Sequence, residues 1–588
     1  MRKKNIENKE HARKVVSKKN IIQILVMVVA VVLVNFVFQY FFCTPVSFRA
    51  WGFWLEIMFS LGVMAVCGWI FRESNSYDGN HDQIDFEYFP TVLGIAVVVI
   101  LILSGIFAWI GSPMFNATTY SNQIEVVDGD FQQDIPEINT DNLIIVDQMT
   151  AQRLGDRTIG GIPNATYYEV DDEYNLIEVN GDYYRISPLN FGGLFKANKA
   201  KSIPGYVLVN AETQSATYKE LDTPMTYSPS AYWSHDLERH IHFAHPSYIL
   251  GKSYFEIDDE GKAYWITEVR SPSIFIFGGS MVNSVVITDA CNGEMVEYAI
   301  NNLPDWVDHA MSVSYLMDKV QKHYVYSGGF GNALFAKQNV YKTAYSYRDA
   351  RTDKDESKFT PFDGYNSVVA KDGTIWFYTG ITPASNSETN YGFVLISPST
   401  GEARFYPASG AEESSAQKAA EGKDQSQKYS ASFPTIYNVD GEMTYFMLLK
   451  DNAGLVQRYA LCNVAEYQKT VQGETLNSTL DLYRKRLAGL TTSSVAVDEP
   501  EQEKNVIPDG VEIKEMEHAI VTEVTTATID GTTYFYFRTE DALAALYVSS
   551  IENSSWQTML LIPGNMVTFK YYDSNEQYVH IVTEIVFK

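Results

Sequence analysis

The sequence is poor in cysteine and lacks the common catalytic signatures. Its 588 residues include no CxxC pair, which argues against a disulfide framework and against a cysteine zinc site. Neither GxSxG, HExxH nor GxxxxGK[ST] occurs, so the usual serine-hydrolase, zinc-protease and P-loop motifs are missing. Two of the four cysteines, Cys43 and Cys67, fall in apolar runs, and only Cys291 and Cys462 could form a bridge.

Basic residues are also scarce, since 45 Lys and Arg face 72 Asp and Glu for a net charge of −27. Binding to phosphate backbones needs clustered Lys and Arg, so we expect no nucleic-acid partner. The basic residues do cluster at the N-terminus, at Arg2, Lys3, Lys4, Lys9, Arg13, Lys14, Lys18 and Lys19. This cluster predicts that residues 1–20 form a cytoplasmic tail.

Three apolar runs follow, at residues 21–43, 52–71 and 91–110, within a membrane region of residues 21–112. Each is long enough to cross about 30 Å of hydrocarbon as a helix, so we expect a multi-pass protein in a lipid bilayer. The loop between the second and third runs is acidic, but acidic residues contribute little to membrane topology. With the N-terminus inside, three crossings place residues 113–588 outside the cytoplasm.

Glu56 is the one acidic residue inside a predicted span. A charged group within a membrane is a functional candidate, because it needs a partner or access to water. Glu56 lies about one helical turn from the outer end of its span, so an interfacial position is the alternative interpretation.

The outer region contains an internal repeat. Residues 174–188 and 205–218 match residues 365–383 and 392–406 in order and spacing, which indicates duplication. Related patterns divide the region, after a connector at 113–140, into four units at residues 141–224, 225–302, 303–408 and 409–487. Tight hairpin turns are predicted where an Asn-Gly or Asp-Gly pair supplies positive φ, at Asn180-Gly181, Asp372-Gly373 and Asp440-Gly441.

A helix is expected before each sheet. Ser228-Pro229 and Leu303-Pro304 carry helix-start signals, and residues 412–423 are rich in helix-favouring Ala. The predicted fold class is therefore membrane-anchored α+β, with three N-terminal transmembrane helices and tandem helix-plus-antiparallel-sheet repeats outside.

These units resemble the PepSY domain, in which a helix precedes a sheet that closes with a strand–"DAxTGE"–strand hairpin. The matching segments are residues 287–296 (ITDACNGEMV) and 397–403 (SPSTGEA). The resemblance covers residues 141–470 as four divergent copies. It implies extracytoplasmic binding or inhibitory modules, and it transfers no catalytic residues.

The C-terminal part differs in character. Residues 488–512 are polar, acidic and contain Pro, as expected of a linker. Residues 513–588 contain about five short alternating strands, which predicts a small β-barrel similar to an OB-fold. Such barrels often bind oligonucleotides or sugars, but the acidic surroundings disfavour nucleic acid.

Four histidines cluster within residues 234–246. On one continuous helix, His235, Glu238, His242 and His245 would share a face and could bind Zn²⁺ or Cu²⁺. Pro246 disfavours helical geometry at His245, and an exposed amphipathic helix is the alternative. No other cofactor is indicated.

The sequence therefore favours a non-enzymatic membrane-anchored binding, scaffold or regulatory protein of the bacterial cell envelope, which recognises a protein or a wall polymer. One alternative is an envelope enzyme or metal-binding factor that uses the His235–His245 cluster. A second is an accessory subunit of a membrane transport or assembly complex, with Glu56 in its working part.

Overall fold

The computed structural model describes residues 18–78, 88–138, 143–162, 164–344, 364–384, 389–422, 429–451, 454–495, 512–529, 532–550, 558, 560–574 and 578–587. Most of the basic N-terminal cluster, residues 79–87 of the loop at 72–90 and most of the predicted linker lie outside these residues. The chain divides into two compact units, residues 1–496 and 497–588, which are described separately.

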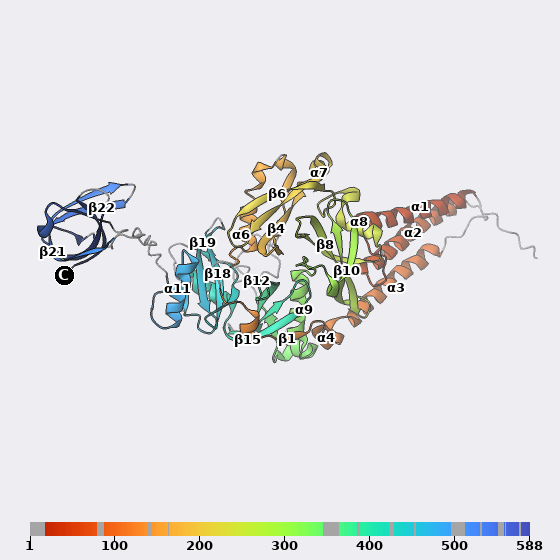
Figure 1. Ribbon diagram of the computed structural model, residues 1–588. Helices are drawn as coiled ribbons and strands as arrows, with labels where there is room; N and C mark the ends of the chain where they lie inside the picture. Colours follow the sequence, from red (N-terminus) through yellow and green to blue (C-terminus); the bar gives the residue numbers. More distant parts are fainter. Residues whose placement is uncertain are drawn as a thin grey trace, which may run out of the picture. The chain divides into compact units, whose positions relative to one another are not determined.

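Three long apolar helices begin the first unit: α1 (Lys18–Phe41), α2 (Trp51–Asp78) and α3 (Phe89–Ile110). The stretches Ile21–Phe41, Trp51–Ser74 and Phe89–Ile110 are long and apolar enough to span a membrane, as predicted. α2 contacts both of the others, and the three lie together in Figure 1. Most of their large apolar side chains are exposed, as expected of a surface that faces lipid.

Four mainly antiparallel sheets, with the helices that accompany them, form the rest of the first unit (Figure 1). The first sheet contains β2 (Tyr168–Val170), β3 (Asn175–Val179), β4 (Asp182–Phe191), β5 (Ile203–Asn210) and β6 (Ala216–Met225). The second contains β7 (Ile249–Ile257), β8 (Ala263–Ile274), β9 (Gly278–Asp289) and β10 (Met295–Ala299).

The third sheet contains β1 (Val126–Asp128), β11 (Tyr341–Thr343), β12 (Asn366–Val369), β13 (Ile375–Pro383), β14 (Thr389–Ile396) and β15 (Ala403–Ala411). The fourth contains β16 (Ser430–Ala431), β17 (Thr435–Val439), β18 (Glu442–Lys450), β19 (Val456–Asn463) and β20 (Thr470–Gly473). Within each sheet, four strands consecutive in the chain form a meander, in which each strand pairs antiparallel with the next.

Each meander follows a helix in the chain. These helices are α6 (Gln148–Gly155), α8 (Leu237–Ala244), α9 (Val313–Tyr326) and α10 (Glu413–Glu421). The shorter helical elements are α4 (Pro113–Ser121), α5 (Phe131–Asp134), α7 (Leu194–Ala200), η1 (Ile159–Gly161), η2 (Ala165–Tyr167), η3 (Trp233–His235), η4 (Ile300–Asn302) and η5 (Asn332–Ala336), and α11 (Leu476–Leu487) follows the fourth sheet.

The predicted hairpin turns are confirmed. Asn180 and Gly181 have φ of 54° and 91° between β3 and β4, and Asp440 and Gly441 have 53° and 88° between β17 and β18. Gly373 has φ of 86° between β12 and β13. Each turn needs the left-handed conformation that Gly, Asn and Asp tolerate best.

Two predicted helix starts are wrong. α8 begins after Asp236 rather than Ser228, and α9 begins after Ser312 rather than near Leu303. The side chain of Asp236 accepts from the Arg239 N–H at 2.8 Å, so the cap lies next to the helix it stabilises. Ser228 is buried and bonded to Ser230 instead.

The sheets bury their apolar faces in pairs. Tyr206 of β5 and Phe255 and Trp265 of the second sheet lie in one core. Phe393 of β14 and Tyr445 of β18 lie in another, between the third and fourth sheets. A fully buried side chain of this size stabilises the fold by about 1.5–3 kcal/mol, so neighbouring sheets depend on each other.

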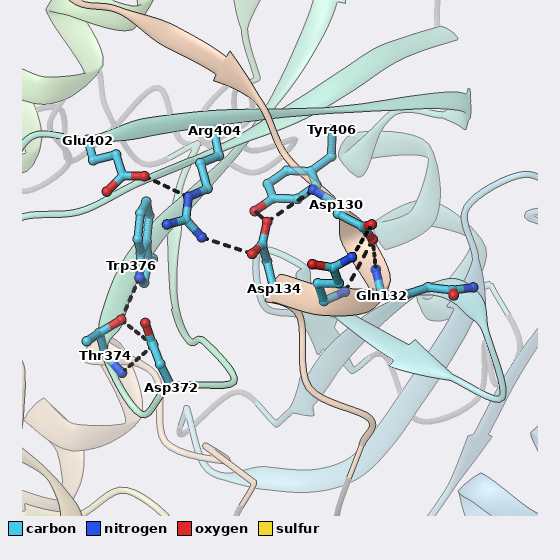
Figure 2. Close-up of polar contacts among 10 residues, drawn as sticks. Asp130, Gln132, Asp134, Asp372, Thr374, Trp376, Glu402, Arg404 and Tyr406 are labelled. Atoms are coloured by element: carbon cyan, nitrogen blue, oxygen red, sulfur yellow. Dashed lines mark hydrogen bonds and ion pairs between the residues drawn. The ribbon is translucent and has the colours of Figure 1, made fainter.

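The predicted connector is attached to the third sheet. β1 pairs in parallel with β15. Asp134 of α5 accepts from Arg404 at 2.9 Å and from the Tyr406 hydroxyl at 2.8 Å (Figure 2). The Arg404 guanidinium also stacks over the Trp376 ring, 4.8 Å from its centroid. These contacts join the segment after α3 to strands that come about 270 positions later.

All four cysteines are free thiols. Cys462 is buried in β19, and Cys291 lies in the β9–β10 turn. The bridge that Cys291 and Cys462 could have formed is therefore not made.

The second unit is a closed five-stranded barrel, which confirms the predicted small barrel. Its elements are β21 (Lys514–Ile529), β22 (Thr532–Thr539), η6 (Glu540–Ala542), β23 (Leu546–Ser550), β24 (Met566–Asp573) and β25 (Val579–Phe587). The strand order around the barrel is β21-β22-β23-β25-β24, with β23 and β25 parallel. Phe537, Tyr547 and Phe569 fill its core.

Candidate functional site

The best-built polar site lies where α8 meets the membrane helices. α8 is amphipathic, and Leu237 and Ile241 are buried in the core of the first two sheets. Its other side carries Arg239 and His242, which contact the end of α1. The short helix thus has one face in the core of the first two sheets and another against α1.

A chain of hydrogen bonds joins α2 to α8 through Gln39 of α1. The Gln39 Nε2 donates to Glu56 Oε2 at 2.8 Å, and the Gln39 Oε1 lies 2.8 Å from His242 Nε2. Glu56 is 6% exposed and His242 is 2% exposed. Polar groups buried near a membrane are stable when they satisfy one another, and this arrangement provides that.

The geometry of the chain defines the protonation of its imidazole. Burial lowers the pKa of His242, so the ring is neutral at physiological pH. Because Gln39 uses its amide N–H on Glu56, its carbonyl oxygen remains to accept. His242 therefore donates from Nε2–H, and the neutral ring has its hydrogen on that nitrogen.

Arg239 provides a second link between α8 and α1. Its Nε donates to the Tyr40 carbonyl at 2.5 Å, and its guanidinium lies 4.6 Å from the centroid of the Tyr40 ring. It also donates to the Trp233 carbonyl. A guanidinium that makes hydrogen bonds and stacks on a ring has little freedom, so this contact fixes α8 on the helix end.

Aromatic rings connect the second sheet and its helix to all three membrane helices. Phe243 contacts Tyr40 of α1, with ring centroids 6.2 Å apart. Two phenylalanines of the β8–β9 turn contact the other helices, in the pairs Phe277–Trp51 at 5.3 Å and Phe275–Phe107 at 5.5 Å. Such aromatic contacts are worth about 0.5–1.5 kcal/mol each beyond burial. We call these contacts, with the Gln39 chain and Arg239, the membrane seat.

The predicted metal-ligand face does not form. The helix spans only Leu237–Ala244, so His235 lies in η3 and His245 lies just past the helix end. The His235 ring contacts Tyr227, and the His245 ring stacks on Tyr248. Across the part of the chain that the structure describes, no three His, Cys, Asp or Glu side chains gather to hold a metal.

The four predicted ligands do not share a face because the helix is short and ends before His245. Asp236 caps the helix after His235, and the backbone at His245 has φ of −131°, so neither histidine continues the stripe. Glu238 is exposed, and His242 is bonded to Gln39. Of these residues only His242 belongs to the membrane seat, which it shares with Glu56, the other candidate from the sequence.

Sequence reasoning missed Gln39 and Arg239. A signal for Gln39 was present, because an amide inside an apolar span needs a partner as a charge does. Arg239 gave no comparable signal, since an arginine on an amphipathic helix is ordinarily solvated.

A second buried polar group lies between the first three sheets. Glu256 of β7 accepts from the His309 N–H at 2.7 Å, from His309 Nδ1 at 2.9 Å and from the Asp308 N–H at 3.0 Å. Asp308 in turn accepts from the Glu178 N–H at 2.7 Å. Glu256 is 0% exposed, so a substrate cannot reach it and its role is structural.

Burial dominates the titration of this group. It raises the pKa of Glu256 to about 8 and, with the nearby Glu256 charge, raises the pKa of Asp308 to about 8. Burial lowers the pKa of His309 to about 4. All three groups therefore favour their neutral forms.

Comparison with known proteins identifies no family. No family model matches the sequence, and no curated protein matches it. Among solved structures, a Trypanosoma rangeli sialidase is 9% identical with a TM-score of 0.17, and the match covers 70% of this chain and 52% of the sialidase. A B. megaterium levansucrase variant is 9% identical with a TM-score of 0.13, over 77% of this chain and 97% of that one. These TM-scores are too low to support an argument about fold or function.

Replacing Gln39 by Leu is expected to loosen α8 from the membrane helices. The variant leaves Glu56 and His242 buried without their partner, which costs about 1–3 kcal/mol for each such group. Hydrogen exchange of the full-length protein in nanodiscs should show faster exchange of α8 amides. Asn35→Leu, an exposed amide one turn earlier on α1, is the matched control. Equal exchange of α8 in the two variants would contradict the role of Gln39.

Proposed function

We propose that the protein is a non-enzymatic, membrane-anchored extracytoplasmic recognition protein of the bacterial cell envelope, with a scaffold or regulatory role. Its outer modules would bind an envelope protein or a wall polymer. The N-terminal basic cluster supports a cytoplasmic N-terminus, and three spans would then put residues 113–588 outside.

The arrangement of the outer elements supports tandem modules. A helix followed by a four-stranded meander recurs four times along the chain. This agrees with the resemblance to PepSY-like repeats, which implies binding rather than catalysis. The barrel's strand order and its parallel β23–β25 pair support an OB-like module at the C-terminal end.

The observation that carries the proposal is the membrane seat. Glu56 and Gln39 belong to the apolar helices, and His242, the other partner of Gln39, belongs to the part that follows them. Because an unpaired polar group in a membrane is costly, the packing of α1 and α2 depends on the seated position of α8. A ligand that shifts the outer modules would therefore change the energy of the membrane helices, which is how a regulatory protein of this kind would act.

The test is cross-linking of the full-length protein in native membranes, followed by identification of what is captured. A fragment of residues 1–112 provides a control bait that has the spans alone. We expect a discrete envelope protein or wall polymer that only the full-length bait captures. Capture of the same multi-span complex by both baits would instead favour the role of an accessory transport or assembly subunit. Identical background captures would contradict recognition by the outer modules.

A further inference from the structure

The first sheet has one face that is only partly covered. Val207 and Val209 of β5 point to the side of α6, where Val207 lies close to Gly155. Side chains alternate along a strand, so Tyr206 and Leu208 point to the opposite face. Phe255 of the second sheet covers part of that face, with its ring centroid 5.7 Å from that of Tyr206.

The rest of this face lines a groove of about 720 Å³. Its floor consists of cross-strand neighbours on β4, β5 and β6, in the pairs Tyr184–Asn210, Leu208–Thr217 and Tyr206–Lys219. Its wall is formed by Asp259, Glu260 and Gly261 of the β7–β8 turn. The Asn180 amide donates to the Asp259 carbonyl at 3.0 Å and the Tyr206 hydroxyl donates to the Gly261 carbonyl at 3.3 Å, so this wall is held in place.

The rim of the groove is strongly acidic. The lining includes one ammonium group, that of Lys219. It also includes five exposed carboxylates, those of Asp182, Glu220, Asp222, Asp259 and Glu260. Among the ion pairs within the described ranges, none involves these five carboxylates. Clustered like charges at a concave surface raise the local potential and attract groups of opposite charge.

The groove also runs along an open sheet edge. β6 ends the order β2-β4-β5-β6, and its strand pairing is with β5 alone among the described strands. The outer side of an edge strand offers backbone N–H and C=O groups that can pair with an added strand. Glu220 and Asp222 lie on this strand, so charge and backbone pairing occur together.

We propose that the groove binds an extended, Lys- or Arg-rich peptide segment of an envelope partner, which adds to the edge of β6. Its basic side chains would lie among the five carboxylates and over the Tyr184 ring. The charge of the rim favours a cationic peptide over a neutral glycan. This inference rests on the proposed recognition function. It adds that the ligand is a cationic, extended peptide.

The probe for the test is a fluorescein-labelled decapeptide of alternating Lys and Thr, which places every Lys on one side of an extended strand. Fluorescence anisotropy measures its binding to the full-length protein in nanodiscs. We expect saturable binding that weakens in high salt, and none by the matched Glu-Thr decapeptide. Two further peptides test strand addition, one N-methylated at its odd-numbered residues and the other at its even-numbered residues. Only one of the two should lose binding, because an added strand uses the amides of alternate residues.

The groove variant combines Asp222→Asn, Asp259→Asn and Glu260→Gln, and it should bind the Lys-Thr peptide at least about tenfold more weakly. The control combines Asp305→Asn, Asp481→Asn and Glu125→Gln, which are exposed residues of the first unit, do not line the groove and change the net charge equally. Equal weakening of both variants, or binding of a neutral wall glycan alone, would overturn the proposal. If the peptide binds but no partner is captured from membranes, the proposal for the groove holds and the proposed recognition function is refuted.

Discussion

Replacing Lys450 by Met is expected to destabilise the first unit by about 3–5 kcal/mol, because the change leaves the Asp147 carboxylate, whose side chain is only 18% exposed, without its cation. Lys450 of β18 is 3% exposed and forms an ion pair with Asp147, which lies 303 positions earlier. Burial alone would raise the pKa of Asp147, but the Lys450 ammonium lowers it, so the folded state holds Asp147 as an anion. Asp147 also caps α6 by accepting from the Thr150 N–H at 2.9 Å.

Chemical unfolding of the full-length protein in detergent measures this effect. The double variant Asp147→Asn/Lys450→Met should recover most of the loss, because both charges are removed and Asn still caps a helix. Lys469→Met is the matched control, since its partner Glu466 is largely exposed and such surface pairs are worth about 0–1 kcal/mol. If Lys450→Met and Lys469→Met lowered the free energy of unfolding equally, the bridge would have no special role.

The second large expected effect is a loss of stability in alkaline solution. The folded-state pKa values of Glu256 and Asp308 are raised to about 8, so the folded protein holds these two protons more tightly than the unfolded chain. Stability is then greatest below the usual carboxyl range near pH 4, and it falls as the pH rises through about 8. His309, with its pKa lowered to about 4, acts oppositely, and its contribution is lost as the pH falls toward 4.

Because two raised carboxyl pKa values outweigh one lowered imidazole pKa, these shifts together predict a stability that falls as the pH rises from about 4 to about 8. Thermal melts at about pH 6 and pH 9 should show a lower Tm at the higher pH. Glu256→Gln should reduce that difference, because an amide keeps the acceptor oxygen without a titrating proton. Glu260→Gln, on the exposed turn after the same strand, should leave the difference unchanged. A pH profile that Glu256→Gln does not alter would contradict this account.

The membrane seat connects two residues that the sequence places in separate hypotheses. Glu56 is a candidate as an intramembrane acid, and His242 is a candidate as a metal ligand. In the structure they are the two ends of one hydrogen-bonded chain through Gln39, so each is explained by the other. This arrangement gives the acid a partner outside its own span, and it gives the histidine a role without metal.

Several features could be predicted from the sequence alone because they depend on neighbouring residues. The three spans follow from runs of about twenty apolar residues, since a helix of that length crosses the hydrocarbon. The turns at Asn180-Gly181 and Asp440-Gly441 follow from the few residues that tolerate positive φ. The five-stranded barrel follows from short alternating strands at regular spacing.

Helix starts show where local signals become ambiguous. Ser228 and Asp236 are both good N-cap residues, and only packing selects Asp236, because Leu237 and Ile241 then fall into the core. The predicted metal face depended on that choice of helix start. Because the helix begins eight positions later than predicted, it presents Arg239 and His242 to α1 and does not present four ligands to an ion.

The sequence by itself determined the spans, the local turns and the barrel, because apolar length and backbone preference act between near neighbours. Only the tertiary structure decided which distant groups meet: Gln39 with His242, Asp134 with Arg404, and Asp147 with Lys450. Such pairs join residues 203 to 303 positions apart, and their stability comes from shared burial after the sheets have packed. A polar side chain shows in sequence that it needs a partner, and the packing of the whole fold selects which partner it has.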